Sequence, residues 1–132
     1  MKSSHHGWRR VFLIKGIYNC LATIGAASGS WLKPEIITDW LGVDAGDHLF
    51  LYLFLLHAFI FGIGFLAVGF NPDRSHAVIS MGALAQAGLF ALASCYFLFW
   101  DTTALVLVAG IIDFIFAILF AVFLWTYRWQ PA

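Results

Sequence analysis

The chain has 132 residues, of which 62% are hydrophobic and only 11% are charged. A soluble domain is roughly half apolar and a quarter charged, so this composition excludes an ordinary soluble globular protein and predicts the lipid bilayer as a partner. Seven Lys and Arg residues balance seven Asp and Glu residues, and without a basic surface we expect no nucleic-acid partner.

Four apolar segments are long enough to cross a membrane, which takes about 20 residues for a hydrocarbon core of about 30 Å. They cover residues 11–31, 48–70, 76–100 and 104–127. The short connections after residues 70 and 100 require neighbouring helices to run antiparallel. The sequence therefore predicts an all-α integral membrane protein, an up-down-up-down bundle of four helices that forms a single domain over residues 1–132.

A basic side chain, Lys15, interrupts the first predicted span about 6 Å from its start, at about 1.5 Å per residue. We expect it to extend along the helix to the cytoplasmic head groups, as Lys residues near span ends do. The alternative is that Lys15 reaches Asp113 or an anionic ligand. In the same span, Gly25 and Gly29 have the spacing of a close helix crossing.

The connection between the first two spans contains a candidate short helix at residues 34–42. Pro34 suits the first turn of a helix, Gly42 suits its end, and apolar residues such as Ile36 and Trp40 lie between them. We expect an external helix on the membrane surface. Three roles are open for this helix: it plugs the end of the bundle, it covers a site as a lid, or it binds a partner.

The basic residues determine the expected orientation. Five lie on one side of a four-span arrangement, whereas Lys33 lies on the other side among acidic residues. Because short cytoplasmic segments carry an excess of Lys and Arg, we expect both termini in the cytoplasm and a multi-pass location in the cell's inner (plasma) membrane. The five basic residues are Lys2, Arg9, Arg10, Arg74 and Arg128.

Each predicted span contains one strongly polar residue far from its ends. Counted along the helices, Asn19, His57, Gln86 and Asp113 all lie about 12–15 Å from a membrane boundary. A polar group that faces lipid at this depth costs several kcal/mol, so the four side chains should turn into the bundle. We predict an internal polar layer of these residues, with the bulky Phe and Leu side chains largely facing lipid.

Three interpretations of the polar layer are open. It is a hydrogen-bonded clamp that fixes helix register, with Asp113 protonated or paired to His57. Alternatively, His57 and Asp113 handle protons or bind the polar head of a lipid-like molecule. In the third, His57 is an axial haem or metal ligand, which we disfavour because His48 and His76 lie near opposite interfaces. The sequence identifies no cofactor and predicts no metal site.

Enzyme signatures are missing from the sequence. It contains no GxSxG elbow, HExxH motif or phosphate-binding loop, and Cys20 and Cys95 lack the spacing of metal ligands. We predict no catalytic residues, and we lean towards a protein that is not an enzyme.

Four short segments resemble a known layout: residues 16–19, 71–76, 82–86 and 112–114. In their order along the chain, they resemble the small uncharacterised four-helix proteins of bacterial inner membranes and, more distantly, the DoxX-like group. Gln86 departs from that pattern, in which a basic residue would be expected. The resemblance implies a location and an architecture, and it transfers no catalytic residues.

Two functions follow as hypotheses. The favoured one is a non-catalytic accessory or assembly subunit of a larger membrane complex, whose partners would be other membrane protein subunits or further copies of the chain. The alternative is a stand-alone binder or proton-coupled transporter of a small amphiphile that uses the midplane polar layer.

Overall fold

The computed structural model describes residues 5–41, 48–100 and 102–127. The long helices are α1 (His5–Leu32), α3 (His48–Phe70), α4 (His76–Phe99) and α5 (Ala104–Thr126), and α2 (Glu35–Leu41) is short. A 3-10 turn, Pro72–Arg74, links α3 to α4. All four long helices are long and apolar enough to cross a membrane, which indicates a multi-pass membrane protein. The predicted all-α class is confirmed.

The helix boundaries agree with the expected ones except at the start of α1. This helix begins at His5 rather than at residue 11. Arg9 and Arg10 lie before the predicted membrane span but inside the helix, because Arg favours helix and its charge does not interrupt the backbone hydrogen bonds. α3 ends at Phe70, just before Pro72, which has no amide proton with which to continue a helix. The helix α1 is therefore longer than the predicted span at residues 11–31.

α1 and α3 form one antiparallel pair, in which glycines bring the two backbones close together. A Cβ atom at Gly16 would lie 2.8 Å from the backbone nitrogen of Leu66, and one at Gly62 would lie 2.7 Å from Sγ of Cys20. At one end of the pair, Nε of Arg9 donates a hydrogen bond of 3.0 Å to the carbonyl of Gly69. Glycine lets membrane helices pack at this distance.

α4 and α5 form the second antiparallel pair. A Cβ atom at Gly110 would lie 2.8 Å from Cβ of Ala93, so these helices also approach closely. His76, the first residue of α4, donates through Nε2 to the carbonyl of Tyr127, 2.8 Å away and just beyond the end of α5.

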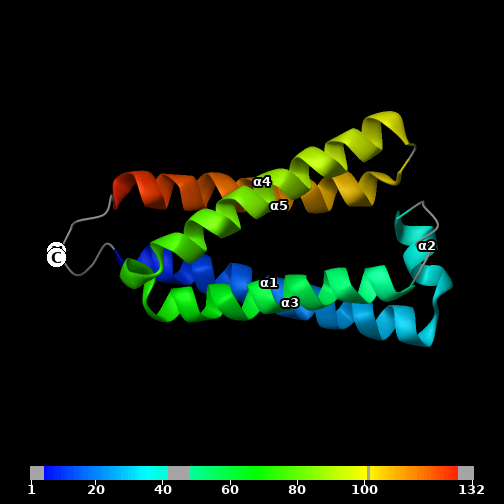
Figure 1. Ribbon diagram of the computed structural model, residues 1–132, viewed down its shortest axis with the longest axis horizontal. Coiled ribbons are helices and arrows are strands. Elements are labelled where there is room, and N and C mark those ends of the chain that lie inside the picture. The colour runs from blue at the N-terminus through cyan, green and yellow to red at the C-terminus, as the bar shows by residue number, and fades with distance from the viewer. Residues whose placement is uncertain (1–4, 42–47, 101, 128–132) are drawn as a thin grey trace.

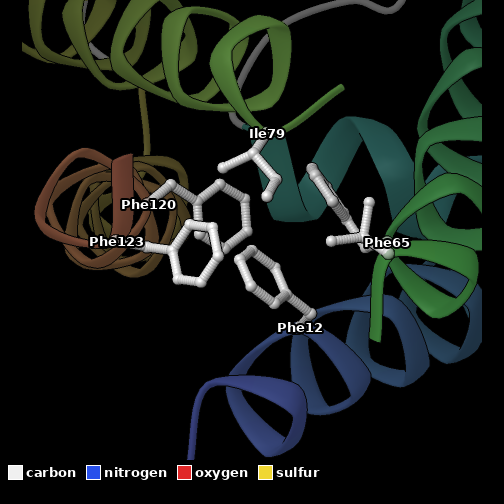
Figure 2. Close-up of a cluster of buried hydrophobic side chains, with 6 residues drawn as sticks. Phe12, Phe65, Ile79, Phe120 and Phe123 are labelled. Carbon is white, nitrogen blue, oxygen red and sulfur yellow. The ribbon is translucent and has the colours of Figure 1, made fainter. Parts of the chain in front are cut away.

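The two pairs meet at a cluster of fully buried side chains that all four long helices contribute. Its aromatic rings point toward one another (Figure 2). The ring centroid of Phe120 lies 4.9 Å from that of Phe12 and 5.0 Å from that of Phe65. We call the following six residues the aromatic cluster: Phe12, Phe65, Val68, Ile79, Phe120 and Phe123. The expectation that bulky Phe residues largely face lipid is wrong for these four phenylalanines, which are the core of the bundle.

Away from the cluster the pairs separate. α4 starts near the end of α3 and then runs obliquely away from it, as Figure 1 shows. The contact between α3 and α4 is slight compared with that inside each pair. At the opposite end of the molecule α2 contacts both α1 and α5. A short helix therefore occurs where one was expected, although Gly42, its expected last residue, lies outside the described residues.

The predicted crossing at Gly25 and Gly29 is wrong for the part of the chain that the structure describes, where no atom lies within 4 Å of a Cβ added at either position. This difference gives a matched experiment. We expect Gly16→Ala to lower the free energy of unfolding by about 1–3 kcal/mol, because the backbone of Leu66 cannot move aside as a flexible side chain can. Gly25→Ala should leave it unchanged or raise it by up to about 1 kcal/mol, because Ala favours helix. Steric trapping in bicelles measures both, and equal effects would contradict the close approach of α1 and α3.

Candidate functional site

A cavity of about 550 Å³ lies between the two helix pairs, and all four long helices contribute to its wall. Phe65 and Gly82 line the end that adjoins the aromatic cluster. Apolar side chains such as Phe54, Leu55 and Leu92 form much of the rest. Cavities of this size and apolar character hold small organic ligands in other proteins.

The structure brings the four predicted site residues together on this wall. Asn19 comes from α1, His57 from α3, Gln86 from α4 and Asp113 from α5. Among the described residues, however, no hydrogen bond joins two of these four side chains. They are neighbours around one space rather than a mutually bonded clamp.

Asp113 forms an ion pair with Lys15. The ammonium of Lys15 donates to Oδ1 of Asp113, and Lys15 is only 1% exposed whereas Asp113 is 20% exposed. The ammonium also lies 5.0 Å from the ring centroid of Tyr18 and 5.1 Å from that of Phe116, both within cation–π range. Asp113 and Tyr18 line the cavity, while Lys15 is not part of its wall.

The expectation that Lys15 extends to the cytoplasmic head groups is therefore wrong, and the alternative contact with Asp113 is the one that forms. Asp113 lies nine residues after Ala104 and 13 before Thr126, near the middle of α5. Its partner must lie at a similar depth. Lys15 lies one helical turn before Asn19 on α1, and its long side chain reaches from there to Asp113. Pairing of Asp113 with His57 is also wrong, since Lys15 takes that place.

Gln86 is the most unusual polar residue of the site. Its side chain is 3% exposed, and neither Oε1 nor Nε2 has a hydrogen-bonding partner among the described residues. An unpaired buried polar group costs about 1–3 kcal/mol, so native proteins retain few of them. An amide with both its donor and its acceptor unpaired, on the wall of a cavity, is a candidate for ligand recognition.

His57 and Asn19 take part in hydrogen bonds within their own helices. His57 is exposed, and its Nδ1 donates to the carbonyl of Leu53 at 2.7 Å, one helical turn earlier. The backbone carbonyl of Asn19 accepts a hydrogen bond of 2.7 Å from the hydroxyl of Thr23, which also lines the cavity. These bonds fix the side chains of His57 and Thr23 against their own helices.

The residue types that bind metal ions are dispersed in the part of the chain that the structure describes. No three His, Cys, Asp or Glu side chains gather there closely enough to hold an ion. Cys20 and Cys95 are free thiols. The arrangement can instead shield one charge pair and offer hydrogen bonds to a guest in an apolar space.

Comparison of the chain with models of protein families, with curated proteins and with solved structures finds no match. The resemblance to the DoxX-like group stays a prediction. The geometry of the cavity is the evidence that bears on function.

Proposed function

We propose that the protein binds a small amphiphile inside the membrane, in the cavity between the pairs α1–α3 and α4–α5. The observation that supports this most is the unpartnered amide of Gln86, buried on the wall of a largely apolar cavity of about 550 Å³. An apolar wall suits a hydrocarbon chain, and a few polar groups suit a head group. Storage, presentation or carriage of such a molecule would all begin with this binding step.

The proposal places four spans in the inner membrane in up-down-up-down order, with both termini in the cytoplasm. In support, Arg9, Arg10 and Arg74 lie at the end of the bundle that holds the aromatic cluster, while Lys33 lies at the other end, after α1. An excess of basic residues marks the cytoplasmic side. The cavity would then lie on the outer side of the aromatic cluster.

The accessory-subunit hypothesis has less support. It depends on the large apolar side chains exposed on the outer faces of the helices, for example Leu84 and Trp125. Lipid requires the same faces of any spanning helix, so they do not indicate a protein partner. A stoichiometric partner found on purification from the native membrane would favour this hypothesis over amphiphile binding.

The test uses the full chain in liposomes and a photoreactive probe, 1-decanol with a diazirine in its tail. We expect light-dependent cross-links at cavity residues such as Leu89 to exceed those at Leu84, which is 75% exposed and reports only the probe dissolved in lipid. Mass spectrometry of the digested protein measures both yields.

Two glycines provide a matched control. Gly88 lines the cavity, and a Cβ there would meet no atom of the described residues within 4 Å, so Gly88→Leu has room for its first carbon and should direct the rest of its side chain into the cavity. We expect it to reduce cross-linking at Leu89 to the level at Leu84. Gly25→Leu, equally free of neighbours but outside the cavity, should leave the yields unchanged. Equal labelling of Leu89 in all three proteins would contradict amphiphile binding.

A further inference from the structure

The amide of Gln86 restricts the kind of head group that the cavity can satisfy. Its Oε1 accepts hydrogen bonds and its Nε2 donates them, and both atoms lack partners in the described part of the protein. A head group that only accepts, such as a ketone or an ether, would leave Oε1 unpaired. A hydroxyl or an amide can both donate and accept, so it can satisfy both atoms.

The charges around the cavity restrict the head group further. Asp113 presents a carboxylate to the wall, and the matching ammonium of Lys15 is fully buried. A carboxylate head group would face the like charge of Asp113. A quaternary ammonium would compete with Lys15 for Asp113 and leave the buried ammonium of Lys15 without its partner, which is strongly unfavourable in a low-dielectric interior.

Tyr18 and His57 are the other titratable groups on the described wall, and they do not change the preference for an uncharged head group. Tyr18 presents its ring to the ammonium of Lys15. His57 is held by the carbonyl of Leu53 through Nδ1, so its Nε2 is the ring nitrogen left for a guest. Both residues can take part in hydrogen bonding with an uncharged molecule.

We infer that the ligand is an uncharged long-chain amphiphile whose head group both donates and accepts hydrogen bonds, a fatty alcohol or fatty amide in chemical class, and that this head binds the amide of Gln86. The inference rests on the proposed amphiphile binding. Because the amide of Gln86 is buried, binding requires its side chain to rotate toward the head group, while the tail lies among Phe54, Leu89 and Leu92.

The experiment compares four diazirine probes with the same decyl tail and different heads. The heads are a hydroxyl, a primary amide, a carboxylate and a trimethylammonium, and the readout is the cross-link yield at Leu89 divided by that at Leu84. We expect the hydroxyl and amide probes to exceed the two charged probes by about tenfold, the effect of one ordinary hydrogen bond. A higher yield with the carboxylate probe would overturn the inference and assign the head group to His57.

Substitution of Gln86 separates recognition from a structural role. We expect Gln86→Leu to remove the preference for the uncharged heads while keeping the fold, because the amide has no partner to lose among the described residues. Gln86→Met, unbranched and close in length to Gln, repeats the test with different packing. If either variant folds and keeps the preference, or if both fail to fold, Gln86 does not recognise the head group.

The two proposals fail in different ways. No excess labelling of the cavity by any of the four probes would overturn amphiphile binding itself. Excess labelling that is equal for all four heads would leave amphiphile binding intact and overturn only the assignment of the head group.

Discussion

Replacement of Asp113 by Ala is expected to lower the free energy of unfolding by about 3–5 kcal/mol, because it strands the ammonium of Lys15 in the interior of the bundle. Lys15 is 1% exposed, and its ammonium also lies over the ring faces of Tyr18 and Phe116. Two cation–π contacts cannot replace a carboxylate at the depth of the membrane. Steric trapping in bicelles gives the free energy of unfolding of both proteins.

The double variant Lys15→Met with Asp113→Leu is the matched control for Asp113→Ala. Since it removes both charges at once, we expect its free energy of unfolding to return to within about 1 kcal/mol of the original value. Asp39→Ala, which removes an exposed carboxylate of α2, should change the value by less than about 0.5 kcal/mol. A single Asp113→Ala variant as stable as the original would mean that Lys15 reaches the membrane surface after all.

The depth of the polar residues could be predicted from the sequence, because depth along a membrane helix is proportional to the number of residues from its end. A fixed rise per residue placed Asn19, His57, Gln86 and Asp113 near one level, and the cost of facing lipid predicted that they turn inward. The structure indeed places all four around one cavity. Four spans were predictable for a related reason, because length and apolar composition are the properties that lipid requires.

The partners of these residues were less predictable, because they depend on how each helix is rotated about its axis. Counting placed Lys15 about 6 Å into the first span, but its contact with Asp113 depends on the direction in which its side chain leaves α1, which counting does not give. Spacing pointed to Gly25 and Gly29 as a crossing, whereas Gly16 and Gly62 make the close approach. Glycine spacing shows that a smooth face exists, and only the packed structure shows which face meets a neighbour.

The sequence could not predict which phenylalanines are buried, for a different physical reason. In water, the hydrophobic effect draws every Phe inward, but lipid solvates an aromatic ring about as well as a protein interior does. Phe65 and Phe120 are therefore buried by shape, while Phe70 and Phe99, the last residues of α3 and α4, lie exposed. A sequence pattern that counts only apolar residues cannot separate the two groups.

Phe65→Ala is expected to lower the free energy of unfolding by about 3 kcal/mol, the low end of the range for a buried Phe, because the transfer to lipid adds little. The ring of Phe65 packs against Phe120 and fills the space above Gly82, where an added Cβ would lie 2.5 Å from Cε1 of Phe65. Phe70→Ala, on the same helix but 71% exposed, should change the value by less than about 0.5 kcal/mol.

The same variant also tests the cavity. Phe65 is at once part of the aromatic cluster and part of the cavity wall, so its loss opens the cavity toward Phe12 and Phe120. Since the two helix pairs are held together mainly by this cluster, the decanol probe should then cross-link to Phe120, which is fully buried in the original protein. Labelling of Phe120 in the original protein at the same yield would mean that the cluster does not close that end of the cavity, and that the probe reaches the core by separation of the pairs.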